Sequence, residues 1–151
     1  MAKRSPRFVA LDHDDHYARH VGRAADGSQF FLTTPFVSAS ASAESPGHEF
    51  VALYRFDSAG TLVEARIEDF GLRAGLDEAR RAAAQAEMLA SLGPVKPGRI
   101  RVAPFEVERF GVKFGFIANP PEDPYDHWVV NVEPGDYMMF LPPWDSGEYD
   151  T

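Results

Sequence analysis

Alternating apolar and polar positions predict strands along most of the chain. In one run, Val63, Ala65 and Ile67 alternate with charged residues, which is typical of a strand with one face on the core and one in water. Similar runs pair across turn sequences: residues 17–21 with 29–34, 49–56 with 61–69, and 127–132 with 137–141. Each turn contains glycine, which accepts the positive φ that tight turns require. The pattern therefore predicts three antiparallel hairpins.

One stretch between the second and third hairpins, residues 78–92, has the features of a helix. Asp77 can cap its first turn by accepting hydrogen bonds from free backbone N–H groups. A Gly-Pro pair at residues 93 and 94 ends it, because proline cannot continue a helix. Three residues are expected to form the stripe that faces the sheet: Ala82, Ala86 and Leu89.

Two further strands are expected after the helix, over residues 99–103 and 105–117. Within the longer run the apolar positions change from odd to even numbers, so we expect a bend or a bulge near Gly111. Residues 38–47 are small and polar and residues 119–126 are rich in proline and acid, so both pieces are predicted to be loops.

These elements predict an α+β fold that forms a single domain over residues 1–151. We expect a mainly antiparallel, twisted sheet of about six to eight strands, with one principal α-helix packed on it. The chain contains no cysteine, which excludes disulfides and cysteine-ligated zinc.

The first residues of the chain do not resemble a secretory signal. The apolar run from Phe8 to Leu11 is too short for one, and no run approaches the length of a membrane span. We therefore expect a cytoplasmic protein that has no membrane partner.

The excess negative charge lies in the last quarter of the chain. Residues 1–113 carry 15 basic and 15 acidic side chains, whereas residues 114–151 carry eight acidic and no basic ones. The same quarter contains both tryptophans. Acidic surface disfavours nucleic acid, because phosphate binding needs clustered positive charge. A field of one sign attracts a partner of the opposite sign.

The leading hypothesis is therefore a non-catalytic binding protein, with the electrostatic profile of an inhibitor or an immunity protein. An acidic, aromatic C-terminal surface would engage a basic protein partner, with the aromatic residues as anchors. The residues expected at this interface are Trp144, Asp145, Glu148, Tyr149, Asp150 and Asp126. The alternative for Trp144 is that it packs on the protein's own core.

A second hypothesis is a small metal-dependent enzyme that uses the His/Asp cluster of residues 12–20. Its expected ligands are His13, His16 and His20, because imidazole and carboxylate suit divalent transition metals. The alternative is a solvated loop, or a single histidine in acid–base chemistry. Calcium is not expected, because Tyr17 stands where an EF-hand loop needs glycine. No other cofactor is indicated.

A third hypothesis is a small-ligand-binding domain, with a pocket between sheet and helix lined by some of the 12 phenylalanines. Arg99 and Arg101 share one strand face and suit a small anion, although a solvated outer face gives the same pattern. The chain has neither a phosphate-binding glycine motif nor the serine elbow of a hydrolase. No reaction is therefore indicated.

Overall fold

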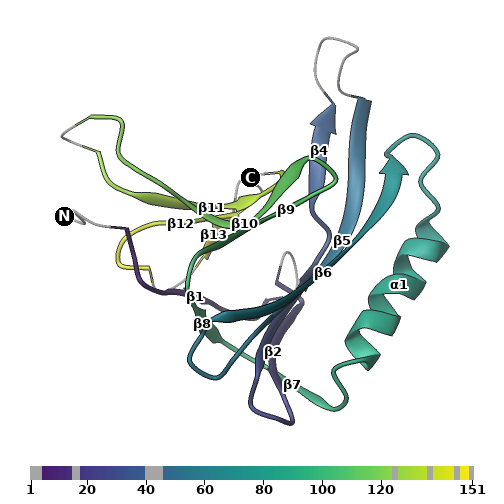
Figure 1. The fold of residues 1–151 in the computed structure, drawn as a ribbon, viewed down its shortest axis with the longest axis horizontal. Coiled ribbons are helices and arrows are strands. Elements are labelled where there is room, and N and C mark those ends of the chain that lie inside the picture. Colours follow the sequence, from purple (N-terminus) through teal and green to yellow (C-terminus); the bar gives the residue numbers. More distant parts are fainter. Residues whose placement is uncertain are drawn as a thin grey trace.

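The computed structural model describes residues 5–14, 18–39, 46–123, 126–135, 138–144 and 147–149. Antiparallel strands dominate this part of the chain, together with one helix (Figure 1). The predicted α+β class and the single principal helix are confirmed. The strands are divided between two large sheets and a short ladder, whereas the sequence predicted one sheet. The alternation of apolar residues shows that a strand has a buried face, but it does not show which strand lies opposite.

The first large sheet has six strands. They are β2 (His20–Ala24), β3 (Gln29–Thr33), β4 (Phe36–Ala39), β5 (Pro46–Phe56), β6 (Leu62–Leu72) and β7 (Val95–Pro97). β5 pairs with β6 along one edge and with both β3 and β4 along the other. The pairings of β2 with β3 and of β5 with β6 confirm the first two predicted hairpins.

β3 and β4 continue one another against β5. Thr33 lies opposite Ala52 and Phe36 lies opposite Glu49, so the register is unbroken between the two strands. The loop predicted over residues 38–47 is therefore partly wrong, because β4 reaches Ala39 and β5 begins at residue 46. The apolar residues of β4 and β5 set the register of this pair, and the same register continues into neighbouring small and polar residues that have little strand propensity of their own.

The second large sheet has five strands, and each pairs with its neighbours in the chain. They are β9 (Phe105–Arg109), β10 (Val112–Asn119), β11 (Val129–Glu133), β12 (Met138–Phe140) and β13 (Gly147–Tyr149). The pairing of β11 with β12 confirms the third predicted hairpin. The remaining two strands, β1 (Val9–Leu11) and β8 (Ile100–Val102), form a separate ladder.

The bend predicted near Gly111 is a complete reversal of the chain. Arg109 lies opposite Val112, so β9 and β10 form a hairpin with only Phe110 and Gly111 between them. Both turn residues have positive φ, 56° and 71°, as a two-residue hairpin turn requires. The change of the apolar positions from odd to even numbers therefore marks a hairpin turn and not a bulge within one strand.

The two large sheets face each other across a shared apolar core. Aromatic rings join them: the rings of Phe50 and Phe114 are 5.0 Å apart, and those of Tyr54 and Phe105 are 4.8 Å apart. In each pair the first ring belongs to β5 and the second to the five-stranded sheet. Edge-to-face contacts of this kind fix the distance and the angle between the sheets.

The helix α1 (Glu78–Ala90) packs on the opposite face of the six-stranded sheet (Figure 1). Its buried residues are Ala84 and Met88, whereas Ala82 and Ala86 are exposed. The predicted stripe is thus wrong at both alanines, although Leu89 does pack against this cluster. The helix is rotated so that Met88 is buried, which removes more apolar area from water than burying an alanine does.

Asp77 caps α1 as predicted, because its side chain accepts a hydrogen bond from the N–H of Arg80 at 3.0 Å. The helix has 13 residues. That length is too short for a membrane span, and the described part of the chain forms no other helix.

Candidate functional site

The outer face of the five-stranded sheet carries the candidate site. On β10, Phe114 and Phe116 are fully buried in the core, so the side chains of Lys113 and Ile117 project from the other face. The only helix among the described residues, α1, covers the other sheet. Among the described residues of this outer face, Glu106 and Lys113 are exposed and Ile117 is half-buried.

Glu106, Gly115 and Glu133 form one row across β9, β10 and β11. Gly115 lies opposite Glu106 on one side and opposite Glu133 on the other. Neighbouring strands are about 4.8 Å apart, so the backbones of the two glutamates are two strand spacings apart, and the residue between them in the row has no side chain. Gly115 has a φ of 145°, and a Cβ atom there would clash with the carbonyl oxygen of Phe105. The central position of the row must therefore remain a glycine.

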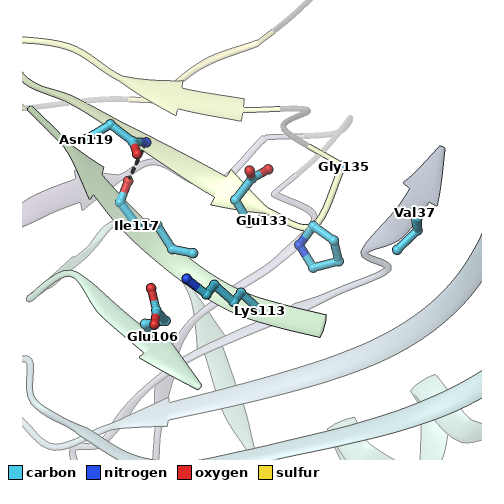
Figure 2. Close-up of a pocket in the computed structure, with 8 residues that line it drawn as sticks. Val37, Glu106, Lys113, Ile117, Asn119, Glu133 and Gly135 are labelled. Atoms are coloured by element: carbon cyan, nitrogen blue, oxygen red, sulfur yellow. Dashed lines mark hydrogen bonds between the residues drawn. The ribbon is translucent and has the colours of Figure 1, made fainter. Parts of the chain in front are cut away.

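A hollow of about 510 Å³ is lined by the two glutamates of this row (Figure 2). Its lining residues are Val37, Glu106, Lys113, Ile117, Asn119, Glu133, Pro134 and Gly135. The side-chain nitrogen of Asn119 donates to the carbonyl oxygen of Ile117 at 3.2 Å and to Oδ1 of Asn131 at 2.7 Å. The amide is held in place by these bonds, so the hollow has a defined polar end.

The charged side chains that line the hollow are two glutamates and one lysine. Lys113 lies opposite Glu108 in the hairpin, and in the view of Figure 2 its side chain lies between Glu106 and Glu133. Within the described residues, neither Glu106 nor Lys113 takes part in an ion pair. Carboxylates accept charge-assisted hydrogen bonds from ammonium and guanidinium groups. The described lining contains no serine, cysteine or histidine that could form a nucleophile–base pair.

Two of the predicted interface residues have described side chains. Trp144 is half-buried and packs against the core between the sheets, which agrees with the alternative that the sequence left open. Asp126 is exposed, and its carboxylate accepts a hydrogen bond from the N–H of His127 at 2.9 Å. The two residues lie in the β12–β13 and β10–β11 connections, which leave the sheet at the same end.

The other four predicted interface residues lie at or beyond the last strand. The backbones of Glu148 and Tyr149 in β13 lie opposite Met139 and Met138. Asp145 and Asp150 lie outside the described residues. A continuous acidic surface at the C-terminus therefore stays a prediction.

The histidine cluster is described only in part. His13 is exposed, His20 is half-buried at the start of β2, and His16 lies outside the described residues. In the part of the chain that the structure describes, no three potential ligands gather, and the metal hypothesis stays a prediction. Burial lowers the pKa of His20 below its ordinary 6.5, and the positive charges of Arg19 and His13 add to this effect.

The third hypothesis placed a ligand pocket between sheet and helix. In that layer Phe30, Leu32 and Met88 pack in one apolar cluster. The hollow beside Glu106 and Glu133 lies on the outer face of the other sheet, and the ligand-pocket hypothesis stays a prediction. The phenylalanines between the six-stranded sheet and the helix pack in this apolar cluster.

Sequence reasoning did not find Glu106, Gly115 and Glu133 as a group. A glycine within an alternating strand does indicate a close approach of another backbone, and this signal was present at Gly115. The row itself depends on the register of three strands, which the pattern of each strand alone does not give.

Comparisons with known proteins do not change this picture. No family model matches the chain. No curated protein sequence and no solved structure matches it either. The function is therefore argued from the geometry and the charge of this chain.

Proposed function

We propose that the protein is a non-catalytic binding protein that engages a basic protein partner through the outer face of its five-stranded sheet. The observation that carries the proposal is the row in which Gly115 separates Glu106 from Glu133. A lysine or arginine side chain of the partner would dock beside Lys113 and donate hydrogen bonds to these carboxylates.

The charge around the row supports a basic partner. Glu106, Glu108 and Glu133 face Lys113 on this surface, so acidic groups are in excess. The exposed Glu122 and Asp123 lie in the connection between β10 and β11. Complementary charge increases the rate of association and rejects partners of like charge.

The C-terminal region belongs to the same surface in this proposal. β13 is the edge strand of the five-stranded sheet, and Glu148 lies in register with Met139 on β12. The interface would extend from the hollow toward this edge, where Glu148 and Tyr149 were predicted to take part. The acidic sheet face and the acidic C-terminus would then engage one partner.

The proposal is tested with an arginine-rich peptide of alternating arginine and glycine, followed by NMR chemical shifts of the full chain. The expected shifts occur at backbone amides of β9, β10 and β11, and binding weakens on raising the salt concentration. The double variant Glu106→Gln, Glu133→Gln is expected to bind at least about tenfold more weakly, since each lost charged hydrogen bond contributes about 1.5–3 kcal/mol.

The matched control removes the same charge from the far side of the molecule. In the double variant Glu78→Gln, Glu87→Gln both changes lie on α1, and binding of the peptide is expected to stay within about twofold of wild type. Equal weakening by both double variants would show that only the net charge matters. In that case the sheet face is not the binding site.

A further inference from the structure

A second hollow lies beside the β1–β8 ladder, on a surface of the opposite charge. Ala10 on β1 lies opposite Arg101 on β8. The residues before and after each of them are fully buried, so Ala10 and Arg101 belong to the outward face of the ladder. On the other edge of β1, the N–H of Ala10 donates to the carbonyl oxygen of Trp144 at 2.9 Å. Arg101 and Trp144 therefore lie on either side of Ala10, whose side chain is small.

This hollow has a volume of about 370 Å³. It is lined by Pro6, Arg7, Phe8, Ala10, Arg99, Arg101, Pro143 and Trp144. Three of these residues are arginines and none is acidic. Asp12 pairs with Arg99 at 3.6 Å, so one of the three guanidinium groups already has a carboxylate partner. The lining keeps a net positive charge although the protein as a whole is acidic.

Two of the three arginines, Arg7 and Arg101, lie against the same phenylalanine ring. The guanidinium carbon of Arg101 lies 4.2 Å from the centre of the Phe8 ring, and that of Arg7 lies 5.9 Å from the same ring. Stacking occupies the flat face of a guanidinium and leaves its N–H edge free to donate. An arginine held in this way is suited to paired hydrogen bonds with the oxygens of a phosphate or a carboxylate.

Trp144 is held at the hollow by its backbone. Its φ is 71°, which is uncommon for any residue except glycine and costly for a bulky one. The N–H of Trp144 donates to the carbonyl oxygen of Leu141 at 2.8 Å, and its own carbonyl accepts from Ala10. Part of the residue packs on the core while it also lines the hollow. Trp144 therefore lies beside the arginines with its backbone fixed by two hydrogen bonds.

We propose that this hollow binds a nucleoside monophosphate. The guanidinium groups of Arg7 and Arg101 would hold the phosphate, and Trp144 would stack on the base, because an indole stacks on any base with little preference for sequence. The site is distinct from the acidic face of the five-stranded sheet, and it would not depend on the basic partner proposed for that face.

The test is calorimetric titration of the full chain with AMP, adenosine and inorganic phosphate as separate probes. AMP is expected to bind at least about tenfold more tightly than either of the other two, because only AMP engages both the arginines and the indole. Equal binding of AMP and inorganic phosphate would reduce the site to an anion site and overturn the proposal, as would no binding of AMP.

Variants then locate the site. Arg101→Gln is expected to weaken binding of AMP at least about tenfold, and Arg101→Lys is expected to restore it only partly, because an ammonium lacks the planar fork. Arg23→Gln is the matched control, since Arg23 is an exposed arginine on β2, and it is expected to leave binding unchanged. Equal affinity of the Arg101→Gln and Arg23→Gln variants would place the binding elsewhere.

One measurement needs no variant and so does not depend on the folding of one. In NMR spectra of the wild-type chain, AMP is expected to shift the backbone amides of Ala10, Arg101 and Trp144 and to leave those of α1 unchanged. Shifts confined to other parts of the molecule would contradict the proposal.

Discussion

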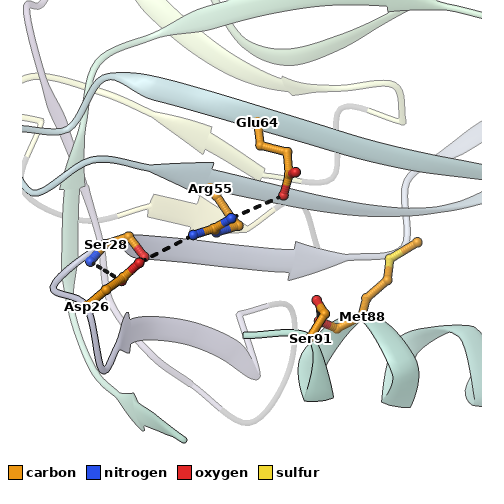
Figure 3. Close-up of polar contacts among 6 residues, drawn as sticks. All are labelled: Asp26, Ser28, Arg55, Glu64, Met88 and Ser91. Atoms are coloured by element: carbon orange, nitrogen blue, oxygen red, sulfur yellow. Dashed lines mark hydrogen bonds and ion pairs between the residues drawn. The ribbon is translucent and has the colours of Figure 1, made fainter. Parts of the chain in front are cut away.

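Ser28 donates two hydrogen bonds to Oδ1 of Asp26, from its backbone N–H at 2.9 Å and from its hydroxyl at 2.6 Å (Figure 3). The two residues lie in the turn between β2 and β3. The other carboxylate oxygen of Asp26 lies 3.5 Å from a guanidinium nitrogen of Arg55. These contacts favour the charged form, and the bonds from Ser28 are the main cause that lowers the pKa of Asp26 below its ordinary 3.8.

The first prediction concerns this turn at low pH. The folded protein holds Asp26 charged to a lower pH than the unfolded chain does, so the stabilisation is present above about pH 4 and is lost as the pH falls through the folded pKa. Asp26→Asn is expected to lower the urea midpoint at about pH 6 and to have less effect at about pH 3. Ser28→Ala should reduce the same pH dependence. A deficit in Asp26→Asn that does not change with pH would contradict this account.

The second prediction tests the packing of α1. Met88 is fully buried against the six-stranded sheet, and Met88→Ala is expected to lower the free energy of unfolding by about 2–4 kcal/mol, because it removes apolar contacts and leaves a cavity. Ala86→Ser on the exposed side of the same helix should cost only a few tenths of a kcal/mol. Urea denaturation measures both. Similar costs for the two variants would mean that the helix is not packed through Met88.

The third prediction concerns the glycine between the two glutamates. Gly115→Ala is expected to lower the free energy of unfolding by about 2 kcal/mol or more, because the residue has positive φ and the new Cβ would clash with Phe105. Gly98→Ala is the control, since a Cβ there meets nothing within 4 Å and its φ is not in the positive range. The control should be neutral or slightly stabilising. Thermal or urea unfolding separates the two outcomes.

The fourth prediction concerns mild acid. Burial lowers the pKa of His20 in the folded protein, so the unfolded chain takes up a proton first as the pH falls below about 6.5. The folded state is therefore expected to lose stability between pH 6.5 and the folded pKa, with no further loss from this group below that value. His20→Gln should have a smaller drop in urea midpoint between about pH 7.5 and pH 5.5. His13→Gln should reduce this drop in part, because the charge of His13 contributes to the lowered pKa of His20. If the urea midpoint of the wild type and of both variants changes identically with pH, His20 does not have this role.

The turns that the sequence predicted are those whose chemistry is local. The turn at Asp26 and Gly27 contains the residues that form it, so its position follows from the sequence. The position of the turn at Phe110 and Gly111 does not follow from the local sequence, because phenylalanine is a poor residue for positive φ. The Phe110 ring stacks on that of Phe50, with the centroids 6.1 Å apart, and this long-range contact accompanies a backbone conformation that the local sequence disfavours.

The orientation of the helix and the position of the site depend on contacts that the sequence does not specify. An alanine-rich helix has small apolar residues on several sides, so a stripe through Ala82 was as consistent with the pattern as the observed one through Ala84. The alignment of Glu106 and Glu133 on either side of Gly115 depends on the pairing of three strands. The charge imbalance of the last quarter is visible in the sequence, but its place on the surface is set by the fold.

The central strand β5 also determines how substitutions in this protein should act. Neighbouring side chains on it enter different layers: Phe50 and Tyr54 pack between the sheets, and Val51 and Leu53 pack beneath the helix. The side chains at two adjacent positions of β5 therefore have to fit two different packing environments. A backbone shift that accommodates a larger residue in one layer displaces side chains in the other, so β5 should tolerate change less than any outer strand.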